Sequence, residues 1–431
     1  MKINKLNDIP TKWEYLPVDE NGRSIWIHCL KECKFTGHNL HYPNVLIHSE
    51  LEDKLYLPYN ERTMSMKTST IYEKNGMEFE YNVLENNKEN NNEKKMEKAV
   101  ENGFFFVYNT DNYYHFIYDT LPFLISYKHL KSTIPDLKLI MNYPNKDKKE
   151  FYKFILETLE IFNLEKEIVI IGNGNTIKCN NLYISTSYTH DIDSNLPPRS
   201  EIYNLYQNMI DMVNTGNTVN NVIPNKTYVD EEIPKKLYIS RRTWIHNDMS
   251  NIGTNYTTRR KMENENELVE KLVKEGYAEI FTENMSMRDK IIYFNNATHI
   301  VGAIGGGICN VVFSKPEAKI IALVSPTFLD VNKRFKYSLE CVNVDYYDKC
   351  YHTEKGKFKK YMRVRHKEGN IYGEIVEIEG NLLKITCTDG SNTGWNFNSK
   401  YDMVYVAKGD VECLDSGLNS NWYVDLESMY V

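Results

Sequence analysis

The sequence predicts an α/β protein with two α/β halves and a small antiparallel β module near the C-terminus. Apolar strand patterns alternate with helical patterns twice, before and after an Asn-, Thr- and Gly-rich stretch at 208–227. Past residue 355 the runs become short, alternating and punctuated by Gly and Asp. A chain of 431 residues is also too long for one ordinary core, which agrees with this division.

The expected domain boundaries follow these changes of pattern. The domains are an N-terminal α/β domain at 1–220, a second α/β domain at 228–354, the β module at 355–412, and a C-terminal segment at 413–431. The stretch 208–227 loses periodicity, so we place the boundary between the two α/β domains there. We expect the module to be an SH3-like or similar five-stranded barrel.

In the first half, short strands and irregular structure at 1–85 precede a regular alternation. The polar, low-complexity stretch 85–98 is typical of a solvated loop. The strands expected after it are GFFFVY (103–108), LKLIMNY (137–143), IVIIG (168–172) and NLYIST (181–186), and the helices span 113–129 and 146–162. This alternation predicts parallel strands with helices on both faces of the sheet.

The second half alternates more clearly. The expected strands are KKLYIS (235–240), AEIFT (278–282), HIVGA (299–303) and KIIALVS (319–325), and the helices span 264–276 and 285–297. Gly276 stands where a helix C-cap belongs. Because ligands of such sheets bind at the carboxyl ends of the strands, we look for functional residues directly after each strand.

Composition excludes several classes of function. A formal charge of −7 and a pI near 6.0 argue against a general nucleic-acid-binding protein, which needs a basic face. The chain has no 18-residue apolar run, and its first residues lack the apolar core of a signal peptide. We therefore expect no membrane span and a cytoplasmic location, with the eight scattered cysteines as free thiols.

One cluster of metal-ligand residue types occurs near the N-terminus. His28, Cys29, Cys33 and His38 lie close together in the sequence, but they lack a CxxC pair. A structural zinc site is the less favoured alternative there, and we expect no metal ligands elsewhere.

The first candidate for chemistry is the sequence HIVGAIGGGICN. A strand that ends in Gly305, Gly306 and Gly307 and leads into a helix lets backbone amides approach a phosphate, with the helix dipole favouring its charge. The alternative is a tight turn that needs only positive φ. Asn310 is expected either to contact the ligand or to be a buried polar residue bonded to backbone.

The second candidate is a pair of arginines around LYISRRTW and TRRKMENENEL. Arg241 directly follows a strand, and Arg260 lies just before a helix that opens with Asn264 and Glu265. Arginine supplies the fixed positive charge that a diphosphate needs. The alternatives are solvated surface arginines and, for Asn264 and Glu265, groups that cap the helix N-terminus.

The third candidate is TDNYYHFIYDTLPFL. On a helix, His115 and Asp119 are four residues apart, so both face one side and can share a hydrogen bond. Such a pair at the edge of a cleft is suited to general base catalysis. The competing interpretation is a structural histidine satisfied within an aromatic core.

Together these stretches resemble glycosyltransferase family 61, which includes plant xylan xylosyl- and arabinosyltransferases and protein O-linked N-acetylglucosamine transferases of the secretory pathway. The family motif NYxHWxxDxLPRL matches Asn112 through Pro122. The SR…R-x-x-x-NE-x-E pattern matches Ser240-Arg241 and Arg260 through Glu267. The helix–strand–GxHGAGLTN block aligns with 289–310, where Ala297, Gly302, Gly305, Gly307 and Asn310 agree.

The chain departs from the family pattern at three positions. The family histidine before the glycine turn is Ile304 here, the preceding proline is Ala303, and the helical glutamine falls at Lys290. A family VD near the C-terminus is present as Val424-Asp425, which suggests that the β module is an insertion. The lack of a targeting segment fits a viral or bacterial enzyme better than the secretory relatives.

The resemblance implies a GT-B-like fold of two Rossmann-like domains, with 1–220 on the acceptor side and 228–354 binding the nucleotide sugar. It implies an inverting transfer from a nucleotide sugar, often a UDP-sugar, to a glycan or glycoprotein, with no tightly bound cofactor and no metal requirement. Asp119 is then the favoured base, assisted by His115. The donor-binding candidates are Arg241, Arg260, Gly305, Gly306, Gly307, Asn310 and Glu283.

Two rival interpretations stay open. One is a metal-dependent transferase that uses Asp191-Ile192-Asp193 as a DxD motif, although such short matches are common by chance. The other is a degenerate transferase fold that serves as a carbohydrate- or nucleotide-binding or scaffold protein, an alternative that Ile304 favours mildly. In that case the β module is the working part, and Trp395 and Phe397 are its candidate carbohydrate contacts, although aromatic residues on such strands more often fill a barrel core. The sequence does not predict the oligomeric state.

Overall fold

The structure is a computed structural model. It describes residues 3–36, 47–56, 58, 97–106, 112–142, 150–171, 176–189, 196–215, 233–242, 261–325, 333–351, 358, 360, 362–366, 372–388, 403–413 and 421–430. Of the expected features, His38, the low-complexity stretch up to residue 96, the DxD triplet, Arg260, Trp395 and Phe397 lie outside these residues.

The chain divides into two compact units. The first contains 1–227 together with 286–292, and the second contains 228–285 together with 293–431. Helix α8 (Met287–Asn296) therefore begins in the first unit and ends in the second. Among the described helices, none combines the length and apolar character that a membrane crossing needs.

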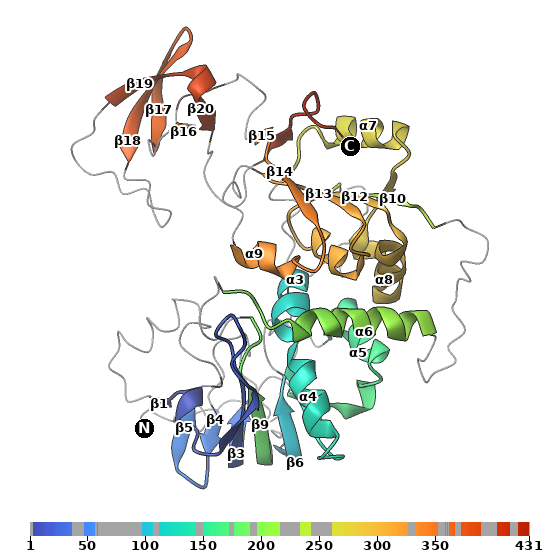
Figure 1. Cartoon of the computed structure of the whole chain (residues 1–431). Helices are drawn as coiled ribbons and strands as arrows, with labels where there is room; N and C mark the ends of the chain where they lie inside the picture. The colour runs from blue at the N-terminus through green and yellow to red at the C-terminus, as the bar shows by residue number, and fades with distance from the viewer. Residues whose placement is uncertain are drawn as a thin grey trace, which may run out of the picture. The chain divides into compact units, whose positions relative to one another are not determined.

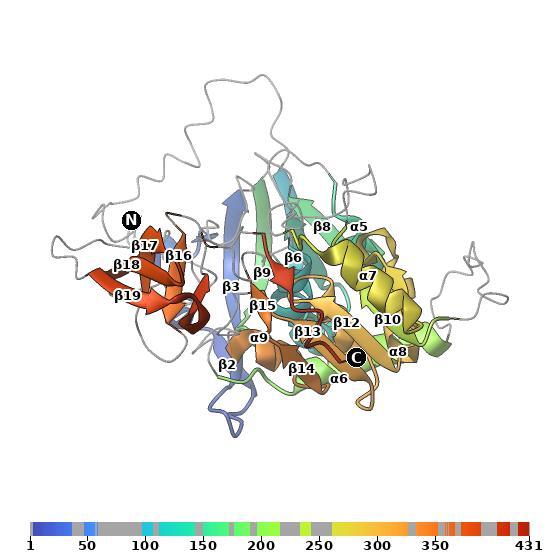
Figure 2. The same ribbon diagram turned by 90° about the horizontal axis from the view of Figure 1, so that it is seen from above.

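The first unit is built on a mixed sheet. Its described strands are β1 (Ile3–Asn4), β2 (Lys12–Leu16), β3 (Ile25–Thr36), β4 (Ile47–Ser49), β5 (Lys54–Tyr56), β6 (Glu97–Phe105), β7 (Lys138–Asn142), β8 (Ile168–Ile171) and β9 (Thr176–Ser185). Strands β9, β6, β7 and β8 are parallel neighbours, whereas β3 pairs antiparallel with β9 and carries β2 and β4. Both views show β3, β9 and β6 side by side (Figures 1 and 2). The expected parallel α/β pattern therefore holds only for the second part of this sheet.

Helices cover the parallel part of this sheet. They are α3 (Tyr113–His115), α4 (Phe123–Lys131), α5 (Lys153–Ile161) and α6 (Glu201–Thr215), and α6 contacts both α4 and α5 (Figure 1). The prediction that periodicity is lost from residue 208 was wrong for 208–215, because α6 continues there. Its buried residues keep helical spacing among the Asn and Thr residues that obscured it: Ile202, Leu205, Tyr206, Met209, Ile210 and Val213.

Three of the four residues of the zinc alternative, His28, Cys29 and Cys33, are buried in the first sheet. His28 and Cys29 are adjacent on β3, so their side chains point to opposite faces. Cys33 lies directly opposite Cys179 on β9. Among the described residues, no three His, Cys, Asp or Glu side chains gather as a metal site.

The second unit contains a parallel five-stranded sheet among its described residues. The strands are β10 (Lys236–Ile239), β11 (Ala278–Ile280), β12 (His299–Ala303), β13 (Lys319–Leu323) and β14 (Val344–Tyr347), with helices α7 (Glu265–Lys274), α8 and α9 (Lys333–Ser338) in the connections. The order is β11-β10-β12-β13-β14, and every neighbouring pair is parallel (Figure 1). Counted along the chain this order is 2-1-3-4-5, a doubly wound arrangement whose direction of winding reverses between β10 and β12.

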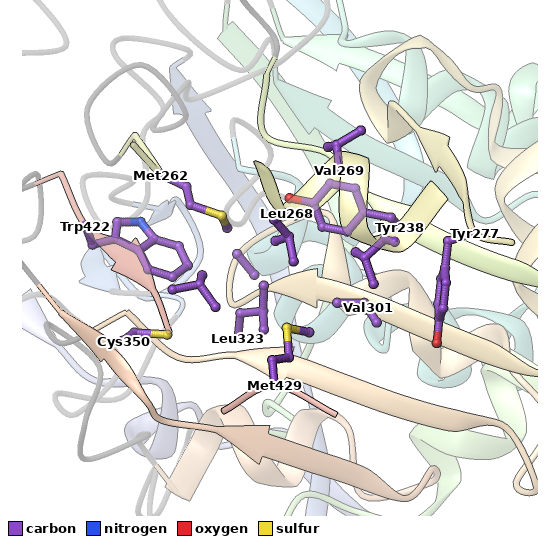
Figure 3. Close-up of a cluster of buried hydrophobic side chains, with 13 residues drawn as sticks. Tyr238, Met262, Leu268, Val269, Tyr277, Val301, Leu323, Cys350, Trp422 and Met429 are labelled. Carbon is purple, nitrogen blue, oxygen red and sulfur yellow. The ribbon is translucent and has the colours of Figure 1, made fainter. Parts of the chain in front are cut away.

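The C-terminal segment completes the core beside this sheet. Strand β21 (Tyr423–Val424) pairs with β15 (Cys350–Tyr351), and Trp422 forms a bridge with Met262. Figure 3 shows Trp422, Met262 and Cys350 in one apolar cluster with residues of the sheet and α7. Lys271 on α7 also donates to the carbonyls of Leu426 and Met429. Segments far apart in sequence therefore share this core.

The β module forms a separate antiparallel sheet. Its described strands are β16 (Arg363–His366), β17 (Tyr372–Glu379), β18 (Leu382–Thr388), β19 (Met403–Ala407) and β20 (Val411–Cys413), in the order β19-β18-β17-β16-β20. Its own small core contains Val364, Ile375, Leu383, Ile385, Val406 and Val411. The alternating pattern past residue 355 therefore marks an antiparallel sheet, as the sequence predicts.

His28 generates a prediction about pH. Its ring is fully buried, neither ring nitrogen has a hydrogen-bond partner, and burial, with a smaller effect of Lys12, lowers its pKa to about 4. Below about pH 6.5 the unfolded chain takes up a proton that the folded chain resists until about pH 4, so the free energy of unfolding falls across that window, by up to about 3 kcal/mol. Urea unfolding at several pH values measures this slope.

His28→Leu removes the group and is expected to flatten the slope, whereas His129→Gln, at an exposed histidine of α4, leaves it unchanged. A His28→Leu variant with the wild-type slope would contradict the assignment.

Candidate functional site

The second unit places Arg241 where the winding of its sheet reverses. Arg241 comes two residues after the end of β10, and the glycine turn directly follows the end of β12, the neighbouring parallel strand. The carboxyl ends of parallel strands lie at the same edge of a sheet, and the point of reversal is where such sheets bind ligands. Two sequence-predicted candidates therefore meet at one edge.

Direct proximity confirms this placement. A Cβ atom added at Gly305 would lie 3.4 Å from Nη1 of Arg241, so the guanidinium is adjacent to the turn. Gly305 has φ +153°, a conformation that favours glycine, so a side chain here is disfavoured both by the backbone and by the guanidinium beside it. The arginine and the open backbone of the turn are thus neighbours.

The rest of the turn is held by packing and internal hydrogen bonds. A Cβ on Gly307 would lie 2.8 Å from Cγ2 of Ile239 on β10, so this glycine permits close approach to the strand. The buried Asn310 side chain donates to the Gly307 carbonyl at 2.8 Å, which is the backbone-bonded alternative that the sequence left open. Sγ of Cys309 donates to the carbonyl of Gly306.

The expected helix after the glycine turn differs from the prediction. Residues Ile308–Phe313 form a six-residue 3₁₀-helix, all of it buried. The helix that the sequence predicts after the turn is thus a short 3₁₀-helix, and the expectation that its N-terminus favours a phosphate stays a prediction. The side chain of Arg241 brings positive charge to the turn.

A buried carboxylate, for which helix capping was one of the alternatives from the sequence, binds the backbone of Arg241. Oε1 of Glu265, the first residue of α7, accepts hydrogen bonds from the Tyr238 hydroxyl (2.8 Å), the Ser240 hydroxyl (3.3 Å) and the Arg241 backbone N–H (2.6 Å). Asn264 does not cap the helix either, because its side chain pairs with the N–H and carbonyl of Val424. Both residues therefore join α7 to other strands.

The charges around Arg241 are buried and opposite in sign. Burial lowers the pKa of the Arg241 guanidinium, and the negative charges of Glu265 and, to a smaller extent, Glu283 act against this. Burial also raises the pKa of Glu265, which the Arg241 backbone and Tyr238 hydrogen bonds oppose. Arg242, in contrast, is paired with Glu279. Arg260, the second predicted arginine, lies outside the described residues.

The first unit contains the predicted His–Asp pair. Nδ1 of His115 lies 2.7 Å from Oδ2 of Asp119, which confirms that the two share a hydrogen bond. The Asp119 side chain is 1% exposed, and its other oxygen accepts a hydrogen bond from the Thr189 hydroxyl at 3.0 Å. The His115 side chain is 36% exposed. The carboxylate is therefore enclosed, and the imidazole is the member of the pair that solvent reaches.

The backbone at this pair is not the regular α-helix that the spacing predicts. Residues Phe116–Thr120 form a π-helical turn, in which Leu121 N–H donates to the Phe116 carbonyl at 2.8 Å. Such turns are rare and are frequent at functional sites. Asn112 begins the helix, because its side chain accepts from the His115 N–H.

Thr189 is held by a buried arginine. Arg23 donates from Nη2 to the carbonyls of Thr189 and Leu196 and from Nε to the carbonyl of Pro197. The backbone that carries the Thr189 hydroxyl is thereby fixed beside Asp119. Neither Thr189 nor Glu265 was predicted as a site residue, because their partners lie 70 and 24 to 27 residues away and no local pattern marks such contacts.

A sequence model of the family described as Glycosyltransferase 61 matches residues 113–321. The matched stretch begins at the helix of His115 and Asp119 and includes Arg241 and the glycine turn. A comparison with curated proteins finds no match.

The hydrogen bond from Thr189 to Asp119 generates a stability prediction. Thr189→Val removes a hydroxyl donor to a buried carboxylate at nearly constant volume, which costs about 1–3 kcal/mol. We expect the free energy of unfolding from urea titrations to fall by this amount. Thr189→Ser, which keeps the hydroxyl, should lose much less, and equal losses in the two variants would show that the methyl group rather than the hydrogen bond matters.

Proposed function

Because residues 113–321 belong to glycosyltransferase family 61, we propose that this protein moves a sugar from a nucleotide-sugar donor to a hydroxyl group of a glycan or protein acceptor. The family membership supports the glycosyltransferase part of this proposal. The observation that carries the proposed donor is the buried guanidinium of Arg241 against the glycine turn, at the reversal point of a parallel sheet.

The chemistry of a diphosphate fits this half of the site. A nucleoside diphosphate leaving group gains negative charge as the bond to the anomeric carbon breaks, and a preorganised guanidinium stabilises that charge. Arg241 is fixed by its surroundings, so little reorganisation is needed when the donor binds. In this proposal Arg241 and Arg260 hold the diphosphate, the backbone of Gly305–Gly307 lets it approach, and neither a metal nor a tightly bound cofactor is invoked.

The His–Asp pair fits the acceptor half. In an inverting transfer, a base takes the proton of the acceptor hydroxyl while the oxygen attacks the anomeric carbon and the nucleoside diphosphate leaves. The sequence favours Asp119 as that base. Its burial and its hydrogen bonds to His115 and Thr189 favour a different division of labour, in which Nε2 of His115 meets the acceptor and Asp119 orients the ring.

We further propose that the two units work as a GT-B-like pair, with 228–354 binding a UDP-sugar and 1–220 binding the acceptor. The doubly wound sheet of the second unit supports this donor assignment. The family match supports a shared task, since one family sequence runs through both candidate half-sites.

The assignment of the base generates a prediction. His115→Ala and Asp119→Asn are both expected to lower the transfer rate by at least about 100-fold, since general base catalysis contributes that much. The dissociation constant of UDP, measured by isothermal titration, should stay within about twofold, because neither residue contacts the donor in this proposal. Transfer or slow hydrolysis is followed with a panel of nucleotide sugars.

The matched control is His129→Ala, which removes an exposed histidine of α4 and should leave the rate unchanged. Full activity in His115→Ala together with an inactive Asp119→Asn would return the role of base to Asp119. Loss of UDP affinity in both variants would place the pair in the donor site instead.

Arg241 generates a prediction about donor affinity. Arg241→Ala removes a charged partner of the diphosphate, which costs about 2 kcal/mol or roughly a 30-fold higher dissociation constant for UDP. Arg241→Lys keeps the charge without the planar fork and should give an intermediate loss. Arg242→Ala is the control, because Arg242 is already paired with Glu279. An unchanged dissociation constant in folded Arg241→Ala would refute the proposed donor site.

A further inference from the structure

We propose that Glu265 is a positioning residue for donor binding, because its carboxylate fixes the end of β10 so that Arg241 lies against Gly305. This inference rests on the proposed function for its meaning, but its geometry stands in the second unit alone. The observations are three hydrogen bonds to one oxygen, the burial of the whole group, and the place of Arg241 beside the turn.

The three hydrogen bonds to Glu265 come from three positions at the end of β10 and just after it. Tyr238 lies within β10, Ser240 follows its last residue, and Arg241 is the residue whose guanidinium lies beside Gly305. All three donate to Oε1 of Glu265. A hydrogen bond from the backbone N–H of Arg241 restrains the Cα position from which its side chain extends. The carboxylate thus fixes the backbone position from which the Arg241 side chain extends.

The second oxygen of Glu265 indicates that the charge itself is used. Oε2 is buried, and no hydrogen bond to it is formed in the structure. A buried anion without full hydrogen bonding is costly unless a cation is near, and the positive charge of Arg241 acts on Glu265, as does that of Arg242. A residue needed only to begin a helix would sit at the surface, as Glu267 does in the same turn.

The helix that carries Glu265 is fixed from its other side. Asn264 pairs with both backbone groups of Val424, and Lys271 binds the carbonyls of Leu426 and Met429. Glu265 is therefore the first residue of a helix that is anchored to the C-terminal segment. Together these hydrogen bonds hold the carboxylate of Glu265 in one position.

The test compares Glu265→Gln, Arg241→Ala and the double variant, with Glu267→Gln as the matched control. Glu265→Gln keeps the shape but removes the charge, and we expect the dissociation constant of UDP to rise by about tenfold. Because Glu265 acts through Arg241, the double variant should bind no more than about threefold more weakly than Arg241→Ala. Losses that multiply in the double variant, or wild-type affinity in folded Glu265→Gln, would overturn the proposal.

A second measurement needs no ligand. The arginine reagent phenylglyoxal, followed by peptide mass spectrometry, reports access to Arg241, with Arg242 as the internal reference. The 8% exposure of Arg241 predicts slow modification in the wild type, and Glu265→Gln should speed it several-fold relative to Arg242. Unchanged reactivity of Arg241 would contradict positioning by Glu265.

The two measurements separate the two proposals. If wild-type protein binds no UDP but Arg241 becomes reactive in Glu265→Gln, the donor assignment fails and the positioning role stands. If Glu265→Gln does not fold, Tyr238→Phe removes one of the three donors and leaves the charge in place. That variant should shift UDP affinity and Arg241 reactivity in the same direction by a smaller factor, and no shift in either would reject the role.

Discussion

One buried carboxylate controls the geometry of the second unit's binding edge. Glu265 joins the first residue of α7 to the end of β10 through three donors on a single oxygen. Lys236 and Arg242 also donate hydrogen bonds to α7 or its C-cap, but the contact of Glu265 is the one that binds the backbone of Arg241 itself. The place of Arg241 beside the glycine turn follows from this contact and from the parallel pairing of β10 with β12.

The described charges around Arg241 supply only part of what an anion-binding site at this edge needs. Burial lowers the pKa of Arg241, and the negative charges of Glu265 and Glu283 oppose this and favour the charged guanidinium. In the proposed donor site, a diphosphate would share the guanidinium with these carboxylates. Arg260 is the sequence candidate for a second positive charge. The hydrogen bond from the Arg241 backbone N–H to Glu265 restrains this residue, and restraint before binding lowers the entropic cost of binding.

Local patterns predicted local features well. The spacing of His115 and Asp119 predicted their hydrogen bond, and the apolar run at 299–303 predicted β12 with the bounds that the structure has. The meeting of Arg241 and Gly305 followed from strand order, because residues after parallel neighbours share an edge. The contact of Thr189 with Asp119 could not be predicted, since it depends on how segments 70 residues apart pack. The antiparallel addition of β3 to the first sheet is a long-range pairing of the same kind.

The shared core of the C-terminal segment has a consequence for biosynthesis. Trp422 and Val424 fill the apolar cluster beside β10 and α7, and Asn264 finds its backbone partners only there. Domains fold as units while the ribosome delivers the chain from its N-terminus. The parallel sheet, although its strands end at Tyr347, must therefore wait for the β module to be translated before its core can close. Chaperones that shield apolar surface have the longest opportunity to act on this unit during that interval.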